Sequence, residues 1–215
     1  MLTVIILEYR DRGFTEEAVR SVLNQTVKPD RIILSTAADR TYIDDRVTIM
    51  HDPTESGGER IYNATKENPS DMYAFLEDDD VWLPNHIEEL YPYYKRIDGK
   101  RGMFYCAAND YDEKASLPGN VSTKAITGNA DFGKIGRFTA IIDTVLYLQA
   151  LEQDMEIVPN DMITVHYRIH SSNWSRGNQE WKSLRDQMLA ALPVEYSHGR
   201  AHEVAEYYMQ RDIGQ

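Results

Sequence analysis

Four consecutive acidic residues near the middle of the chain offer the clearest chemistry in the sequence. Glu77–Asp80 directly follows Met72–Leu76 (MYAFL), an apolar run that is expected to form a buried strand. Crowded carboxylates repel one another, so at least one pKa should be raised unless a cation neutralises the group. Mg²⁺ and Mn²⁺ are hard ions that bind carboxylates together with substrate phosphate oxygens. The run therefore predicts an Mn²⁺ or Mg²⁺ site, with a solvated acidic turn as the alternative.

Alternating strand and helix signals surround this acidic run. Thr3–Leu7 (TVIIL) is a β-branched run typical of a strand buried on both faces, and a helix is expected to begin at Thr15 as its N-cap. Further strands are expected at Arg31–Leu34 and Val47–Met50, with a helix over Gly57–Asn68. This alternation predicts an α/β fold with a mostly parallel sheet.

Polar side chains follow the predicted strands at the point where each strand ends. Glu8 follows the first strand, Thr36 follows the second and Glu77–Asp80 follows the fourth. Parallel sheets bind their ligands beyond the carboxyl ends of the strands. We therefore expect these side chains to converge on one crevice at one edge of the sheet.

The second half of the sequence is less regular. Strands are expected at Met103–Ala107 and Met162–Ile169, and Pro92 should end or kink a helix expected over Pro84–Tyr91. Asp112–Arg137 is rich in Gly, Ser, Thr and Asn, which predicts a long functional loop.

Composition narrows the class of partner. The chain has 215 residues and a formal net charge of −12, which disfavours binding to nucleic acid and to anionic lipid. Its single cysteine, Cys106, excludes an internal disulfide and fits a reducing compartment. The sequence contains no apolar run long enough to span a bilayer and no recognisable secretion signal. These features predict a cytoplasmic protein without a transmembrane segment.

Three segments of the chain resemble, in order, segments of the family 2 glycosyltransferases. They are Ser21–Thr26 (SVLNQT), Phe75–Pro84 (FLEDDDVWLP), which resembles the segment carrying the DxD motif, and Tyr167–His170 (YRIH). The resemblance implies a GT-A-like (Rossmann-like) α/β fold, with a mostly parallel sheet flanked by helices over residues 1–180. Residues 1–105 would bind the nucleotide sugar and residues 106–180 the acceptor. Residues 181–215 read as a helical C-terminal extension.

The resemblance implies an inverting, metal-dependent transferase of the hexosyltransferase type. It would move a sugar from a nucleotide-diphosphate donor to an acceptor hydroxyl on a glycan, a lipid-linked sugar or a small molecule. By similarity, Asp78 contacts the donor ribose, Asp79 and His170 bind Mn²⁺ or Mg²⁺, and Glu77 stands at the family's first Asp. A lone His after a strand is as often structural as functional. The metal would stabilise charge on the leaving diphosphate.

Asp143 is the candidate catalytic base. Ile142–Leu148 (IDTVLYL) resembles the family's Glu-Asp-x-x-Leu segment, with Ile142 in place of the Glu. Partial burial would raise the pKa of this carboxyl and improve it as a base. The alternative role is a plain helix N-cap.

Further donor contacts are implied around the strand ends. They are Leu7, Glu8, Tyr9, Thr36, Arg60, Asn63 and, in a candidate lid, Arg176. Leu7–Arg10 (LEYR) replaces the family's Pro-Thr-Tyr-Asn, and Thr36–Asp39 (TAAD) replaces its Asp-Asp-Gly-Ser. The carboxylate that reads uracil is therefore absent or is supplied by Glu8 or Asp39, and the nucleotide base stays open.

Three other functions remain open from the sequence. The altered strand-end motifs allow a sugar-nucleotide-binding protein of the same fold that has lost transfer activity. A nucleotidyltransferase would carry a Gly-rich basic loop after the first strand, and Arg10–Gly13 (RDRG) is a poor version of one. An acidic interaction domain would leave the position of Glu77–Asp80 unexplained.

Overall fold

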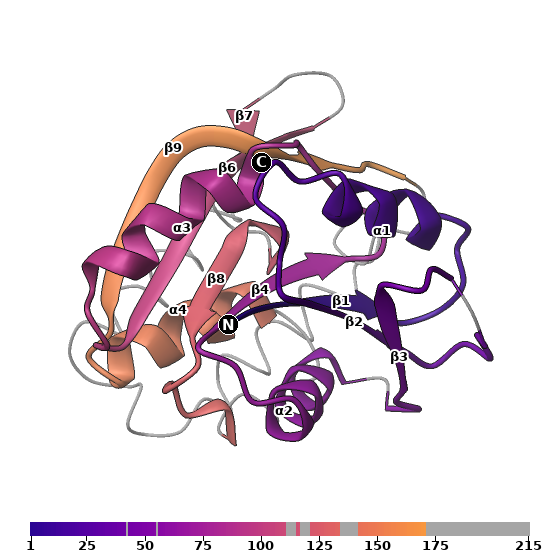
Figure 1. Ribbon diagram of the computed structural model, residues 1–215, viewed down its shortest axis with the longest axis horizontal. Helices are drawn as coiled ribbons and strands as arrows, with labels where there is room; N and C mark the ends of the chain where they lie inside the picture. The colour runs from indigo at the N-terminus through magenta and orange to yellow at the C-terminus, as the bar shows by residue number, and fades with distance from the viewer. Residues whose placement is uncertain (42, 55, 111–114, 117–120, 134–141, 171–215) are drawn as a thin grey trace, which may run out of the picture.

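Helices cover both faces of one nine-stranded sheet in the computed structural model of the chain (Figure 1). The structure describes residues 1–41, 43–54, 56–110, 115–116, 121–133 and 142–170. The described elements, in chain order, are β1 (Leu2–Glu8), α1 (Thr15–Leu23), β2 (Arg31–Thr36), β3 (Val47–His51), α2 (Gly57–Glu67), β4 (Met72–Glu77), β5 (Val81–Trp82), α3 (His86–Arg96), β6 (Gly102–Asp110), β7 (Ala115–Ser116), the 3₁₀ turn η1 (Val121–Thr123), β8 (Lys124–Thr127), α4 (Ile142–Glu152) and β9 (Glu156–Tyr167).

The first four strands form a parallel sheet in the order β3-β2-β1-β4, as the sequence predicts. The register pairs Glu8 on β1 with Thr36 on β2, and Leu7 with Glu77 on β4. The carboxyl ends of neighbouring strands therefore lie side by side. This register gives the expected crevice its position at one edge of the sheet.

The sheet continues through strands of mixed direction. β8 pairs antiparallel with both β4 and β6, β9 runs parallel to β6, and β5 pairs antiparallel with β9. The prediction of a loop throughout Asp112–Arg137 is wrong at Lys124–Thr127, where all four residues of β8 are buried. Pairing with antiparallel neighbours on both sides stabilises this strand, although its four residues carry no strand pattern of their own.

Alternate residues of β1 supply two separate cores. Val4 and Ile6 pack with apolar residues of α1 and α3. Ile5 and Leu7 pack on the other face with residues of α2 and α4. Figure 1 shows the same layering, with α1 and α3 above the sheet and α2 and α4 below it. A strand buried on both faces explains the continuous apolar run at the N-terminus.

Pro92 was expected to end or kink the helix over Pro84–Tyr91, and the first of these two alternatives is wrong for α3. The helix runs through Pro92 to Arg96. Pro92 removes the hydrogen bond to the Glu88 carbonyl, but both residues are exposed, so water can satisfy that carbonyl. Burial of Ile87 and Leu90 on the opposite side of the helix outweighs the lost bond.

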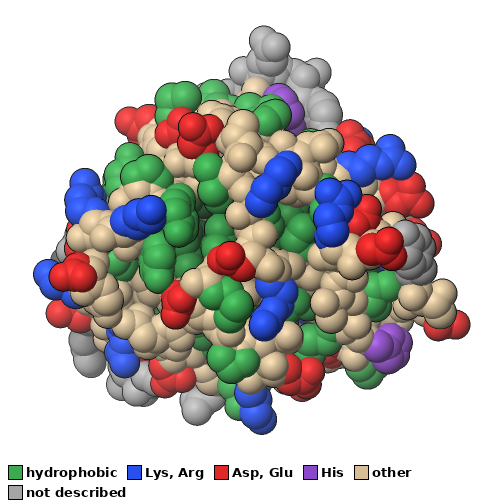
Figure 2. Space-filling model, in the orientation of Figure 1, with side chains coloured by type: hydrophobic (Ala, Val, Ile, Leu, Met, Phe, Trp, Pro, Cys, Tyr) green, Lys and Arg blue, Asp and Glu red, His purple; other side chains and the backbone are tan. Residues whose placement is uncertain are grey.

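Charged side chains of both signs are interspersed over the face shown in Figure 2, so neither sign forms a continuous field there. Among the described residues, no helix combines the length and the apolar character needed to cross a bilayer. The candidate lid with Arg176 and the helical extension over residues 181–215 lie outside the described residues.

Candidate active site

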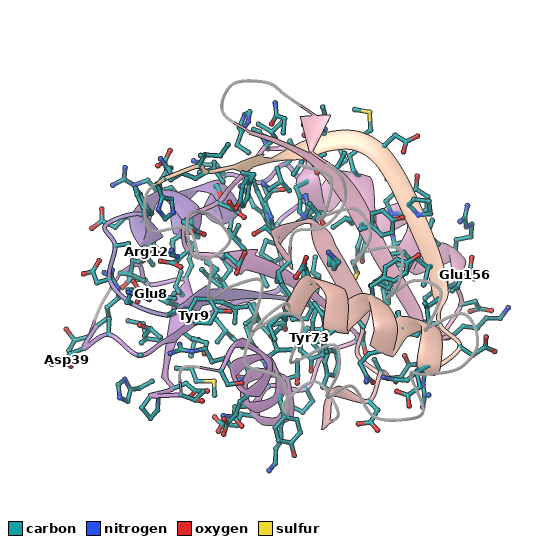
Figure 3. All side chains as sticks on the ribbon, turned by 180° about the vertical axis from the view of Figure 1, so that it is seen from behind. Glu8, Tyr9, Arg12, Asp39, Tyr73 and Glu156 are labelled. Carbon is teal, nitrogen blue, oxygen red and sulfur yellow. The ribbon has the colours of Figure 1, made fainter. Side chains whose placement is uncertain are left out.

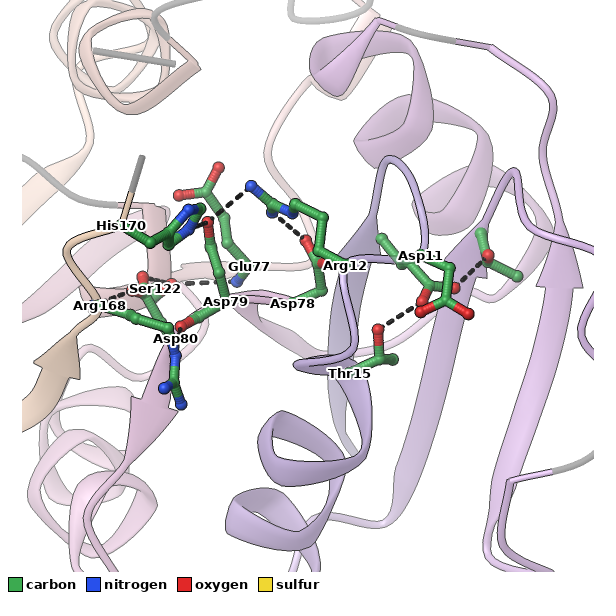
Figure 4. Close-up of polar contacts among 12 residues, drawn as sticks. Asp11, Arg12, Thr15, Glu77, Asp78, Asp79, Asp80, Ser122, Arg168 and His170 are labelled. Atoms are coloured by element: carbon green, nitrogen blue, oxygen red, sulfur yellow. Dashed lines mark hydrogen bonds and ion pairs between the residues drawn. The ribbon is translucent and has the colours of Figure 1, made fainter. Parts of the chain in front are cut away.

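The acidic run forms a tight turn between β4 and β5 (Figure 4). The Asp78 N–H donates to the Leu7 carbonyl of β1 at 3.1 Å, and the Asp80 N–H donates to the Glu77 carbonyl at 3.2 Å. β5 then pairs with β9, so both sides of the turn are held by strands. Asp78, Asp79 and Asp80 are consequently only 0%, 7% and 0% exposed. This burial does not fit a simple solvated turn.

Three of these carboxylates are placed to share a cation. Glu77, Asp79 and Asp80 each offer one oxygen, and these atoms all lie within 4.8 Å of one another. Asp78 Oδ2 is buried and has no hydrogen-bond partner among the described residues. Closely spaced hard oxygens, beside a buried oxygen that still lacks a donor, fit a divalent ion such as Mg²⁺ or Mn²⁺.

The end of β9 brings a distant segment of the chain onto the acidic run. The Arg168 N–H donates to Asp80 Oδ1 at 3.1 Å, and its Nε donates to the Asp79 carbonyl at 2.9 Å. His170 Nε2 lies 3.0 Å from Asp79 Oδ2, although the two residues are 91 positions apart. The structure therefore brings the two predicted metal ligands together.

Ser122 in η1 braces the acidic turn and was not identified from the sequence. Its hydroxyl donates to Asp80 Oδ2 at 2.6 Å and accepts from the Glu77 N–H at 3.0 Å. The Trp82 indole donates to the Ser122 carbonyl at 2.7 Å. These contacts connect both ends of the turn to η1 and limit its movement.

Burial and crowding raise the pKa of two carboxyl groups in the run. Burial, followed by repulsion from Asp79, Asp80 and Asp143, raises the pKa of Glu77 well above its usual range. Burial raises the pKa of Asp78 to about 7, although its bond with Arg12 acts in the opposite direction. Both groups therefore favour a proton or a nearby cation, as the crowding of acidic residues in the sequence predicts.

Arg12, in the loop between β1 and α1, supplies such a cation. Its Nη2 lies 2.6 Å from Asp78 Oδ1, and its Nη1 lies 2.9 Å from Asp79 Oδ2. In the sequence, Arg12 stands out only as part of Arg10–Gly13, a poor version of the Gly-rich basic loop expected in a nucleotidyltransferase. Its pairing was missed because a contact across 66 residues leaves no local pattern.

A buried lysine, Lys124, and the candidate base, Asp143, both interact electrostatically with Glu77. Lys124 opens β8 and is 1% exposed, and burial lowers its pKa to about 8 against the opposing influence of Asp143 and Glu77. Asp143 is half-buried in the first turn of α4. The structure thus brings the candidate base toward Glu77. A lysine inside Val121–Thr127 (VSTKAIT) is the sequence signal that could have identified Lys124.

Glu8 is enclosed by hydrogen-bond donors at the end of β1. It accepts from the hydroxyls of Thr15 and Thr36 and from Arg40 Nε at 2.8 Å. Burial alone would raise the pKa of Glu8, but these bonds, led by Arg40, hold it below its usual value. Thr15 was predicted to be the N-cap of α1, and this prediction is wrong. The N-cap is Phe14, and the Thr15 hydroxyl donates to Glu8 instead.

Arg60 closes the carboxyl ends of β1 and β2 from the start of α2. The guanidinium donates to the carbonyls of Thr54 at 2.7 Å, Glu8 at 2.9 Å and Ser35 at 3.2 Å. It also lies 5.4 Å from the centre of the Tyr9 ring.

The remaining predicted donor contacts are placed as follows. The Leu7 side chain lies in the core shared with α2 and α4. The Asn63 amide donates to Asp52 Oδ2 at 3.0 Å, beyond the end of β3. Figure 3 shows Glu8, Tyr9 and Arg12 gathered at one end of the sheet, with Asp39 at the outer edge of the molecule.

Comparisons with known proteins point in one direction. The chain matches no protein-family model. It is 24% identical over 122 residues to a protein of Rickettsia prowazekii named as an uncharacterized glycosyltransferase, covering 54% of this chain and 38% of that one. It is 31% identical over 113 residues to the succinoglycan biosynthesis protein ExoW of Rhizobium meliloti, covering 45% and 35%. The chain thus spans little more than a third of these relatives.

Solved structures show the same fold over nearly the whole chain. S. aureus TarS in complex with UDP-GlcNAc superposes with a TM-score of 0.71 at 11% identity, over 99% of this chain and 72% of that one. TarS in complex with UDP superposes with a TM-score of 0.62 at 10% identity, over 100% and 72%. The predicted GT-A-like α/β fold is confirmed by this likeness.

Proposed function

We propose that the chain is a glycosyltransferase that moves a sugar from a nucleotide-diphosphate donor to an acceptor hydroxyl. The observation that carries the proposal is the buried acidic turn at the carboxyl edge, with Glu77, Asp79 and Asp80 oxygens within 4.8 Å of one another. The relatives named as glycosyltransferases and the fold shared with TarS support it. In this class of fold, a nucleotide ligand also binds beyond the carboxyl ends of the strands.

In this proposal, the donor lies over residues 1–105. Asp79 would hold Mn²⁺ or Mg²⁺ together with Glu77, Asp80 or His170, and Asp78 would accept from the donor ribose. Such a metal would supply positive charge that stabilises the departing diphosphate. The buried turn keeps these carboxylates fixed before the donor arrives, so little reorganisation accompanies the reaction.

The acceptor lies over residues 106–180, beside the start of α4. Asp143 removes the hydroxyl proton while the acceptor oxygen attacks the anomeric carbon. The bond from that carbon to the diphosphate oxygen breaks, and the nucleoside diphosphate leaves. Attack opposite the leaving group inverts the anomeric centre. General base catalysis of this kind contributes about 10²–10⁴-fold in rate.

Glu8 does not suit the role of reading the nucleotide base. Its carboxylate already accepts from Thr15, Thr36 and Arg40. TarS was solved with UDP-GlcNAc and with UDP, so uridine donors are the first to test here. Asn63, which is half-buried beyond the end of β3, is the proposed contact on the nucleoside side, whereas Arg60 is fully buried and already donates to three carbonyls.

Thermal unfolding of the protein with a panel of nucleotide-sugar donors, with and without Mn²⁺, tests the proposal. A bound donor stabilises the folded protein by RT ln(1 + [L]/Kd), about 2.7 kcal/mol at a hundredfold excess over Kd. Asp79→Asn should abolish the Mn²⁺-dependent part and lower turnover by about 10²-fold or more. Asp143→Asn should keep donor binding and lower turnover by about 10²–10⁴-fold. Asp45→Asn, at an exposed position, is the matched control.

The outcomes separate the competing functions. Stabilisation without turnover would instead favour a nucleotide-sugar-binding protein. Pyrophosphate release from a nucleoside triphosphate would favour a nucleotidyltransferase. Full turnover by both Asp79→Asn and Asp143→Asn would refute the assigned site.

A further inference from the structure

The Arg12 guanidinium lies between two carboxylates that the proposed function assigns to the donor and the metal (Figure 4). It spans Asp78 Oδ1 at 2.6 Å and Asp79 Oδ2 at 2.9 Å, and its side chain is 15% exposed. Two oxygens of one buried acidic turn therefore already have a positively charged partner. Asp78 Oδ2, beside them, lacks a hydrogen-bond partner among the described residues.

Arg12 and a divalent ion compete for the same oxygen. Asp79 Oδ2 is the atom that faces both Arg12 Nη1 at 2.9 Å and His170 Nε2 at 3.0 Å. A metal ion bound there would lie next to the guanidinium. Two cations on one buried oxygen repel strongly, because little water screens them. The guanidinium must therefore leave Asp79 when the metal arrives.

Arg12 lies in the loop between β1 and α1, next to a glycine with open space around it. Gly13 follows it with φ +79°, and a Cβ at Gly13 would meet nothing within 4 Å. The other side of the loop is anchored, because Asp11 pairs with Arg40 at 3.0 Å. A side chain between an anchored residue and an open glycine can turn without unfolding β1 or α1.

Charge balance keeps the displaced guanidinium near the site. Four carboxyl groups lie in the run, and a donor diphosphate adds further negative charge that one divalent ion cannot neutralise alone. A guanidinium fork matches two phosphate oxygens as well as it matches two carboxylates. Arg168 is less free to serve, since it is held by Glu17, by the Asp79 carbonyl and by the Phe14 ring.

We propose that Arg12 is an exchangeable counter-ion, which holds Asp78 and Asp79 until a divalent metal displaces it onto the diphosphate of the donor. This inference rests on the proposed function and adds a donor-binding residue to it. It makes two effects of removing Arg12 opposite in sign, which a purely structural ion pair would not produce.

The first measurement is Mn²⁺ binding in the absence of nucleotide. Binding is monitored through the loss of the electron paramagnetic resonance signal of the free ion. Arg12→Ala removes the competitor, so its Mn²⁺ Kd should fall by about tenfold. Arg12→Lys keeps the charge without the planar fork and should fall between Arg12→Ala and the parent protein. Arg10→Ala removes an exposed arginine of the same loop and should change nothing.

The second measurement is calorimetric binding of UDP, and of inorganic pyrophosphate as a base-free probe, at saturating Mn²⁺. Arg12→Ala should weaken binding of the diphosphate by about tenfold to a hundredfold, the range for hydrogen bonds to charged groups. Arg10→Ala should again match the parent protein. Thermal unfolding of every variant reports whether the fold is intact.

Tighter Mn²⁺ binding together with weaker diphosphate binding supports the inference. Changes of the same sign in both measurements, or no change beyond that of Arg10→Ala, overturn it while leaving the proposed function in place. Absence of Mn²⁺ and diphosphate binding in the parent protein and in all variants overturns both. If Arg12→Ala does not fold, the Mn²⁺ and diphosphate affinities of Arg12→Lys are compared with those of Arg10→Ala. Changes of opposite sign then support the inference, and changes of the same sign overturn it.

Discussion

Two neighbouring strands end in carboxylates, and the two ends behave in opposite ways. Glu8 closes β1, while the run from Glu77 closes β4, and the register pairs Leu7 with Glu77. Glu8 is fully buried and its pKa is lowered. Asp78, also fully buried, has a pKa raised to about 7. Burial alone therefore does not decide how a carboxylate at this edge behaves.

The difference lies in the supply of hydrogen-bond donors. Glu8 receives two hydroxyl groups and a guanidinium, whereas Asp78 receives one guanidinium and keeps one oxygen without a partner among the described residues. A satisfied carboxylate stabilises the fold, and an incompletely satisfied one is available to a ligand. We therefore propose a structural role for Glu8 and a ligand-binding role for the acidic run Glu77–Asp80.

The largest expected effect on stability comes from Glu8→Gln. The substitution leaves Arg40 with the exposed Asp11 as its remaining charged partner and disturbs two buried hydroxyls, so the free energy of unfolding should fall by about 3–5 kcal/mol. Asp78→Asn is the counterpart at the other strand end and should lower it by no more than about 1 kcal/mol. Urea denaturation of both variants measures this. Equal losses would break the distinction between the two strand ends.

Ser122→Ala should have a smaller effect, and it tests how the acidic turn is held. The variant removes a buried hydroxyl that donates to Asp80 and accepts from the Glu77 N–H. We expect a loss of about 1–3 kcal/mol in stability, the cost of leaving buried polar groups unsatisfied. Thr41→Ala, at an exposed position, is a control. A Ser122→Ala variant as stable as this control would show that the turn does not depend on η1.

The smallest expected effect is on the pH dependence of stability. The pKa of Glu8 in the folded chain lies below its ordinary value of 4.5, so the unfolded chain binds more protons in acid. The stabilising contribution of Glu8 is present above that value and is lost as the pH falls through the folded-state pKa. The parent protein should therefore lose stability more steeply than Glu8→Gln between about pH 6 and about pH 3. The exposed Glu16→Gln should follow the parent curve.

Sequence patterns predicted the parts of the fold whose signals are local. The apolar run of β1, the acid-rich start of α1 and the acids after β4 all depend on neighbours in sequence. β8 was missed because its pairing with β4 and β6 is long-range and its four residues show no alternation. Pro92 misled the helix prediction because exposure, which removes the penalty at Glu88, is set by tertiary packing.

In the candidate site, too, the residues with local sequence signals were predicted and those that depend on long-range contacts were not. The acidic run and His170 were found through residue types in recognisable segments, and the fold brought them within 3.0 Å. Arg12, Ser122 and Lys124 were not found, because their importance comes from contacts between distant segments. The hydrogen bonds that satisfy the Glu8 carboxylate could not be predicted either, since Arg40 is 32 residues away in sequence.

β9 has a consequence for how this chain matures during synthesis. The acidic turn emerges from the ribosome early, yet its partners Arg168 and His170 follow the last described strand, which must pair with both β6 and β5. Translation adds about 5–20 residues per second, so roughly 90 further residues take about 5–18 seconds. During that interval the nascent chain carries a half-built acidic turn, and docking of a single strand completes it.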